Sequence, residues 1–110
     1  MRKVFDVAAT NDVRLTVPSV VVAEWWRTGV KEKERAKILR SVEVEPVTDY
    51  VAWLAGAALS LVPRAQTIDA IVMASACQRP NEIIYTSDPR DLEALRSRVP
   101  RFASLRIEQA

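Results

Sequence analysis

The chain has 110 residues, of which 49% are apolar and 27% charged, with two glycines and six prolines. This length and composition predict one small ordered domain with a single core, and they exclude a disordered protein. The formal net charge of +2 permits an anionic partner without requiring one. Histidine is absent and Cys77 is the single cysteine, which excludes histidine-based catalysis, zinc sites built on His or Cys, and a disulfide framework.

The sequence shows neither an export signal nor a membrane-spanning segment. It does not open on a basic-then-apolar leader, and no apolar run approaches ~18 residues. Cys77 lies in an apolar stretch and is expected to pack in the core. These features, together with the missing disulfide framework, predict a cytoplasmic location.

The elements predicted before residue 48 are a short helix over 3–10, a strand over 14–17, a helix over 20–27, a charged helix over 31–40 and a strand over 42–47. Both strands alternate in polarity, which is typical of half-buried strands. We expect Pro18 to end the first strand and Ser19 to cap the helix that follows it.

Thr48 is predicted to cap the clearest amphipathic helix of the chain, which Pro63 ends. Its apolar residues follow the i, i+3, i+4, i+7, i+8, i+11 rule, and they are Val51, Leu54, Ala55, Ala58, Leu59 and Val62. The later elements are a buried helix over 67–79, a strand over 81–86, a helix over 90–98 and a strand over 103–107.

The segment from Thr67 to Arg79, TIDAIVMASACQR, has one acidic residue, Asp69, in an otherwise apolar or small run. It predicts a helix buried nearly all round, with Thr67 as its N-cap and Asp69 in its first turn. A buried carboxylate needs hydrogen bonds, a cationic partner or a metal ion. Because free backbone N–H groups also stabilise an acid in a first turn, a catalytic role and a local role both remain open.

Strands that alternate with helices predict parallel pairing. We therefore expect residues 1–110 to form one α/β domain, a three-layer α/β/α sandwich with a mostly parallel sheet. In such sheets, functional residues collect at the carboxyl ends of strands and at the starts of the helices that follow. Glu24, Asp69 and Asp88 occupy places of this kind.

Each acid also has a local interpretation. Glu24 can pair with Arg27 at i+3 on an exposed face. Asp88 before Pro89 is suited to N-capping, and Asp91 can add negative charge to the first turn of the helix. Together, however, clustered carboxylates are how a protein without histidine binds Mg²⁺ or Mn²⁺. Such ions activate water and neutralise the charge that develops in phosphodiester cleavage.

Three segments resemble conserved blocks of the PIN-domain family, specifically of its VapC-type toxins. They are VPSVVVAEWWR (17–27), TIDAIVMASA (67–76) and IIYTSDPRDL (83–92). They follow the order of the second, third and fourth blocks of the family, and the strand over 42–47 with its amphipathic helix falls between the first two of them. The resemblance covers essentially the whole chain.

The resemblance implies an Mg²⁺- or Mn²⁺-dependent endoribonuclease that is held inactive by a partner antitoxin and forms a homodimer. Glu24, Asp69 and Asp88 match acids of the family, and Thr86 matches a hydroxyl residue that helps to orient the site. In this mechanism Asp69 and Asp88 hold the metal ion, and Glu24 positions or deprotonates the attacking water. Glu24 and Asp91 are further candidate metal ligands.

Arginines offer contacts to RNA phosphates. Arg64, Arg79 and Arg90 are candidates for this role. The alternative for each of them is an exposed side chain surrounded by water.

The chain departs from the family at its start. The family begins with a short apolar strand that ends in an invariant Asp, and a long segment separates it from the next strand. Here Lys3 to Phe5 with Asp6 would have to supply that strand, but only Val7 to Val13 would then connect it to the strand over 14–17. A parallel crossover needs about a dozen residues or more. We therefore expect that Asp6 is not the missing acid and that the first strand is absent, unless the natural protein begins further upstream.

In the family the first strand lies at the centre of a sheet of order 3-2-1-4-5. Its loss would leave a gap between the strands over 14–17 and 81–86, which must close by direct pairing, be filled by another chain, or weaken the fold. A site that lacks one carboxylate also has less negative charge to hold a divalent cation.

Two functions remain open at this point. The first is a ribonuclease toxin with clustered carboxylates. The second is a degenerate, non-catalytic PIN-like remnant that binds a protein partner such as an antitoxin. Trp25, Trp26 and Trp53 could serve such an interface, although tryptophans more often pack in a core.

Overall fold

The computed structural model describes residues 15–27, 33, 37, 39–40, 42–79, 82–86 and 89–109. Its elements are β1 (Leu15–Pro18), α2 (Ser19–Trp26), β2 (Val42–Glu45), α4 (Asp49–Leu61), α5 (Thr67–Ala76), β3 (Ile83–Thr86), α6 (Pro89–Arg98), the 3₁₀ helix η1 (Pro100–Phe102) and β4 (Arg106–Gln109). The helix predicted over 3–10, Asp6 and Asp88 lie outside the described residues. Of the helix predicted over 31–40, the described residues 33, 37, 39 and 40 are helical.

The four strands of the described residues form two parallel pairs. In the first pair Leu15 of β1 lies opposite Val42 of β2, and in the second Ile83 of β3 lies opposite Arg106 of β4. Helices alternating with parallel strands confirm the α/β class. The described strands, however, form two separate two-stranded sheets, β1–β2 and β3–β4, instead of one sheet. Direct pairing of β1 with β3 therefore does not close the predicted gap in the described part of the chain.

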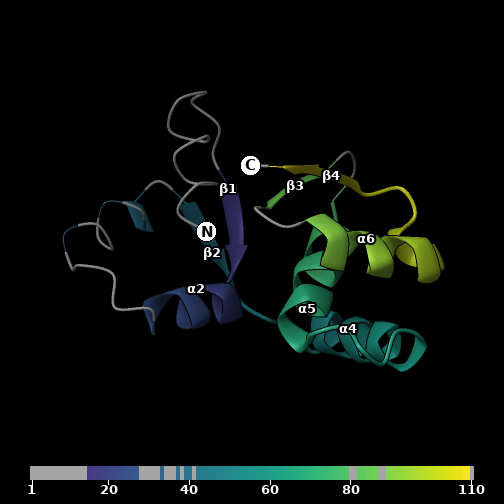
Figure 1. Cartoon of the computed structure of the whole chain (residues 1–110). Helices are drawn as coiled ribbons and strands as arrows, with labels where there is room; N and C mark the ends of the chain where they lie inside the picture. The colour runs from purple at the N-terminus through teal and green to yellow at the C-terminus, as the bar shows by residue number, and fades with distance from the viewer. Residues whose placement is uncertain are drawn as a thin grey trace.

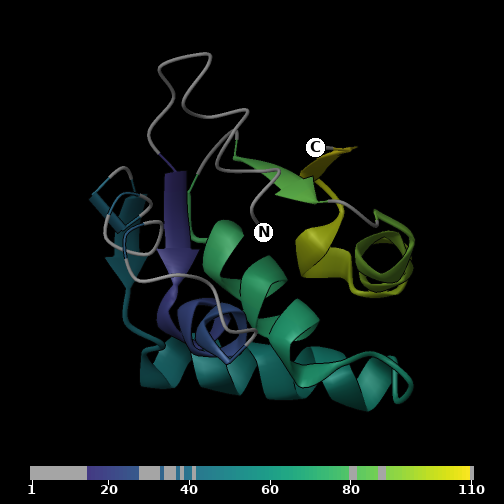
Figure 2. The same ribbon diagram turned by 60° about the vertical axis from the view of Figure 1, so that its left-hand side comes forward.

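In Figure 1 both strand pairs lie above α5, with β1–β2 to the left and β3–β4 to the right. Helix α4 packs along α5 on the side away from the strands, and α6 packs against α5 near β4 (Figure 2). Small residues on both helices, such as Ala55 and Ala58 on α4 and Ala70 and Ala74 on α5, are buried at the core. Small side chains let two helix axes approach to about 8 Å. Most residues of α5 are buried, so its predicted burial is confirmed.

Two clusters of buried apolar residues form the core. The larger combines α4, α5, α6 and η1, and its largest fully buried side chains are Phe102, Met73, Leu95 and Val51. The smaller consists of Val17, Val21 and Val42, from β1, α2 and β2. Val20 and Val72 pack against both clusters, so the first strand pair is joined to the helical core by side-chain packing.

The start of α4 matches the sequence prediction. Thr48 has an extended backbone, and its Oγ1 accepts a hydrogen bond from the backbone N–H of Val51 at 3.2 Å. The predicted inward face is buried at Val51, Leu54, Ala55, Ala58 and Val62, with Leu59 half-buried. Within the described ranges, neither α4 nor any other helix combines the length and the apolar character needed to cross a membrane.

Two predicted N-caps are wrong by one residue. The N-cap of α2 is Pro18 and that of α5 is Gln66, and neither makes a side-chain capping hydrogen bond. Because the extended backbone conformation required of an N-cap falls on these residues, Ser19 and Thr67 are already the first residues of their helices. Pro18 is also the last residue of β1, a position where the missing N–H of proline is tolerated.

The strands predicted over 42–47 and 103–107 have different bounds in the structure. Strand β2 stops at Glu45, before Pro46, because proline cannot donate to a strand ladder. The predicted strand over 103–107 was wrong at its start. Pro100–Phe102 form η1, which places Phe102 in the core, and β4 begins only at Arg106.

Replacing Thr48, the N-cap of α4, tests the start of that helix. Thr48→Ala removes the acceptor of the Val51 N–H and is expected to lower the free energy of unfolding by about 1 kcal/mol. The matched control is Thr67→Ala, in the first turn of α5 but not at its N-cap, with an expected change within about 0.5 kcal/mol. Urea denaturation measures both, and equal losses would contradict the assignment.

Candidate functional site

Asp69 lies in the first turn of α5, as the sequence predicts, and is partly exposed. The residue before it, Ile68, packs against the cluster of β1, α2 and β2, and the residue after it, Ala70, is completely buried. Asp69 is therefore anchored on both sides while its carboxylate stays at the edge of the core. The N-terminus of α5 stabilises negative charge at this position.

Glu24 lies on α2 and makes the local ion pair that the sequence permits. Its Oε1 is 2.5 Å from a guanidinium nitrogen of Arg27, and the two side chains are 43% and 74% exposed, respectively. Exposed pairs of this kind contribute about 0–1 kcal/mol. The pair therefore holds Glu24 only weakly in its present orientation.

The other candidates are the last residue of β3 and residues that follow it closely in the sequence. Thr86 is the last residue of β3 and is partly buried. Asp88 lies outside the described residues. Pro89 begins α6, and Asp91 lies in the first turn of this helix with an exposed side chain, as predicted.

The described residues do not by themselves form a metal-binding cluster. No three of their acidic or sulfur-bearing side chains are grouped so that they could hold a metal ion together. The chemistry of the donor set nevertheless fits a hard cation, because Glu24, Asp69 and Asp91 all offer carboxylate oxygens. The predicted group includes Asp88, so a complete set would need this residue as well.

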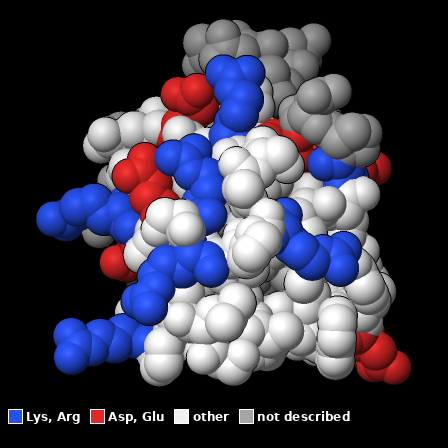
Figure 3. Space-filling model, turned by 90° about the vertical axis from the view of Figure 1, so that its right-hand side faces the viewer, with Lys and Arg blue, Asp and Glu red and all other residues white. Residues whose placement is uncertain are grey.

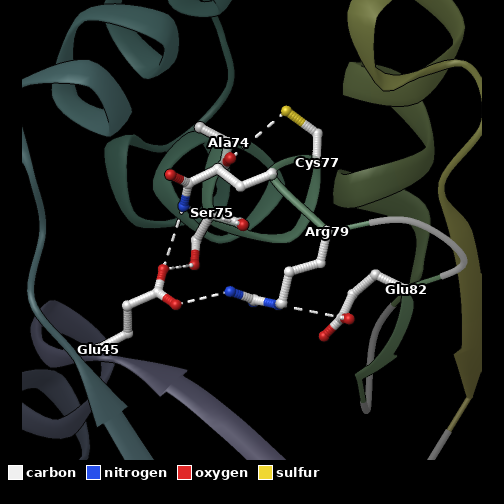
Figure 4. A network of polar contacts seen from close by, with 7 residues as sticks. Glu45, Ala74, Ser75, Cys77, Arg79 and Glu82 are labelled. Atoms are coloured by element: carbon white, nitrogen blue, oxygen red, sulfur yellow. Dashed lines mark hydrogen bonds and ion pairs between the residues drawn. The ribbon is translucent and has the colours of Figure 1, made fainter.

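A polar network that the sequence did not predict joins β2 to the end of α5 (Figure 4). Oε1 of Glu45 accepts hydrogen bonds from the Ser75 hydroxyl at 2.8 Å and from the Gln78 amide at 3.2 Å. Oε2 of Glu45 is 2.6 Å from a terminal nitrogen of Arg79. Both carboxylate oxygens are therefore engaged by the last turn of α5 and the residues that follow it.

Arg79 lies between two carboxylates (Figure 4). Besides Glu45, it faces Glu82, whose Oε2 is 3.4 Å from the buried Arg79 Nε. This second contact is an ion pair without hydrogen-bond alignment, because the same nitrogen has no hydrogen-bond partner among the described groups. Arg79 thus connects β2 to the residue that precedes β3. Its contact with RNA phosphate stays a prediction.

The alternation of the 42–47 segment gave no signal for this network. Val42 is buried, but Val44 is 44% exposed and Glu45 is partly buried. Period-two patterning assigns Glu45 to the solvent face and cannot reveal that Ser75, Gln78 and Arg79 lie opposite it. These partners are 30 to 34 positions away in the sequence, so only the tertiary fold identifies them.

Cys77 packs against the core, as predicted, and has the properties of a structural thiol. Its Sγ donates to the carbonyl oxygen of Ala74 at 3.4 Å. Burial raises the pKa of the Cys77 thiol, and the positive charge of Arg101 opposes this shift. A raised pKa keeps the sulfur protonated and weakens it as a nucleophile.

Neither a protein-family model nor a curated protein matches the sequence of this chain. The resemblance to PIN domains therefore depends on the three sequence segments described above. In the structure these segments correspond to β1 with α2, to α5, and to β3 with the start of α6.

The Glu45 network predicts unequal costs for two identical substitutions. Glu45→Gln removes the charge that faces Arg79, and hydrogen bonds to charged groups contribute about 1.5–3 kcal/mol. With these side chains about one quarter to one third exposed, we expect a loss of about 1–2 kcal/mol. Glu24→Gln breaks an exposed pair and should cost at most about 1 kcal/mol. Chemical denaturation of both variants measures the difference, and similar losses would be inconsistent with a stabilising network.

Proposed function

We propose that this chain is a metal-dependent endoribonuclease, the toxin of a toxin–antitoxin pair, with Mg²⁺ or Mn²⁺ as its cofactor. The observation that carries the proposal is Asp69, a carboxylate in the first turn of a helix that is otherwise apolar and mostly buried. A carboxylate at the edge of such a core is suited to bind a cation or a reacting group. Cytoplasmic location, an antitoxin partner and a homodimer belong to the same proposal.

The proposed roles follow the resemblance of the sequence segments. Asp69 and Asp88 hold the metal ion, with Asp91 as an auxiliary ligand, and the bound ion supplies neutralisation of the charge that develops on the phosphate. Glu24 positions the attacking water, and Thr86 helps to orient the site. For Glu24 to act, it must turn away from Arg27, which costs little because exposed ion pairs contribute about 0–1 kcal/mol.

The charge of the surface supports an anionic substrate. The chain carries 16 Lys and Arg residues against 14 Asp and Glu residues. Lys and Arg side chains cross the middle of the face shown in Figure 3, while acidic side chains lie mainly toward its edges. Basic side chains of this kind attract the phosphate backbone of RNA through long-range electrostatics.

Substitution of Asp69 tests the nuclease proposal. Asp69→Asn is expected to lower Mg²⁺-dependent RNA cleavage on the order of 10²-fold or more, because a bound cation stabilises transition-state charge by several kcal/mol. Asp49→Asn is the matched control, since Asp49 is an exposed acid in the first turn of α4 and is not a candidate ligand. Cleavage of a fluorescent RNA measures both variants. Cleavage that persists in EDTA, or that both variants retain, would refute the proposal.

The second candidate function is a non-catalytic remnant that binds a protein partner. It is favoured by the ion pair that engages Glu24 and by the exposed aromatic side chains of α4. Titration calorimetry with Mn²⁺ distinguishes the two functions. The nuclease predicts binding that disappears in the double variant Asp69→Asn/Asp88→Asn, whereas a remnant predicts no specific Mn²⁺ binding in either protein.

A further inference from the structure

The outer face of α4 carries a row of exposed apolar side chains. The large ones are Tyr50, Trp53 and Leu61, which are 44%, 65% and 50% exposed. With the exposed Ala57 they recur at i, i+3, i+7 and i+11, so they share one side of the helix. Three of the five large apolar residues that are exposed in the described part of the chain therefore lie on this one helix. The core covers the opposite side of α4.

Between its two ends this row carries no charge. Asp49, at the first position, is the one charged residue of the helix. The hydroxyl of Ser60 donates to the Ala57 carbonyl oxygen at 2.7 Å, and a polar group that is already bonded loses less when water is removed. From Tyr50 to Leu61 the row is about 17 Å long, at 1.5 Å per residue. The row can therefore leave water along its whole length.

An arginine lies near each end of the row. Arg101 of η1 lies 5.8 Å from the centre of the Tyr50 ring and donates a hydrogen bond to its hydroxyl. A guanidinium group has five N–H groups, so Arg101, which is exposed, can bind a phosphate oxygen as well. Arg64 follows Leu61 by three residues and is also exposed. The face thus combines an apolar middle with basic ends.

The two aromatic rings of this face are ordered against each other. Trp53 stacks on Tyr50, with ring centroids 6.4 Å apart and an interplanar angle of 29°. Tryptophan and tyrosine combine an apolar ring with a polar N–H or O–H group, and they concentrate where membrane hydrocarbon meets water. Side chains that are already ordered lose little conformational entropy on binding.

We propose that the outer face of α4 binds the surface of a lipid bilayer that contains anionic lipids. The helix would lie parallel to the membrane plane, with Trp53 and Leu61 at the boundary between headgroups and acyl chains. Arg64 and Arg101 would meet the lipid phosphates, which suit the planar guanidinium fork. A helix bound in this way does not cross the bilayer. This surface lies outside the proposed nuclease site, so the inference does not depend on RNA cleavage.

The size and the charge of this face favour a bilayer over a protein or RNA. A specific protein interface needs about 800 Å² from each partner, whereas three large side chains that are about half exposed offer on the order of 300 Å². Single-stranded RNA needs basic side chains along the stacking rings, and α4 itself contains none. A bilayer surface accepts a short apolar row with basic neighbours and requires no matching contour.

Binding of the full chain to lipid vesicles tests the inference. Vesicles of phosphatidylcholine and phosphatidylserine are expected to sediment with the protein and to shift its tryptophan emission to shorter wavelength. Vesicles of phosphatidylcholine alone should bind it more weakly. Trp53→Ala should lower the partition coefficient on the order of 10-fold, because it removes the most exposed ring. Val44→Ala, at an exposed apolar residue of β2, is the matched control and should bind normally.

The charged residues near the ends of the row give a second measurement. Arg64→Gln should weaken binding to the anionic vesicles by about 5-fold. Asp49→Asn should strengthen it, because this change removes a negative charge that the anionic lipids repel. Lys33→Gln removes an equal positive charge from an exposed position outside α4 and should change binding little. The effects of Arg64→Gln and Asp49→Asn should shrink at high salt.

Three outcomes would overturn the inference. The first is no binding to anionic vesicles at low salt, and the second is binding that Trp53→Ala and Arg64→Gln both leave unchanged. The third is self-association, or binding of single-stranded RNA, that is lost in Trp53→Ala while vesicles do not bind. That result would assign the face to a second copy or to nucleic acid. Circular dichroism checks that each variant is folded, and none of these results depends on the test of Asp69.

Discussion

The burial of α5 is the constraint on which the rest of the structure depends. Within the described residues no strand ladder joins β1–β2 to β3–β4, so packing on α5 has to hold the two pairs together. Met73 and Ala74 are completely buried, and Val72 contacts both core clusters. A two-stranded sheet has little stability of its own. Any change that disturbs the small side chains between α4 and α5 should therefore loosen both strand pairs at once.

The two ends of α5 carry opposite charges, and both agree with its dipole. Asp69 lies in the first turn, where partial positive charge accumulates, and Arg79 lies just beyond the last turn, where partial negative charge accumulates. The basic end is used structurally, because Arg79 is enclosed by Glu45 and Glu82. The acidic end is stabilised by the free N–H groups of the helix, whereas Glu45 on β2 is committed to Arg79.

The sequence predicted those features that are encoded locally. The cap at Thr48, the buried face of α4, the burial of α5 and the Glu24–Arg27 pair all depend on neighbours within one or two helical turns. Features that depend on distant residues could not be predicted, namely the engagement of Glu45 and Arg79 and the separation of the strands into two sheets. Helix starts were wrong by one residue because Ser19 and Thr67 are good caps, whereas backbone conformation selected Pro18 and Gln66. The grouping of Asp88 with the other acids remains a prediction.

The position of α4 keeps its exposed apolar face apart from the candidate site residues. In Figures 1 and 2 this helix forms one side of the molecule and the strands lie on the other side of α5. The candidate residues lie on α2, α5, β3 and α6 or directly beside them, and none lies on α4. An interface on the outer face of α4 would thus use residues that the candidate site does not need.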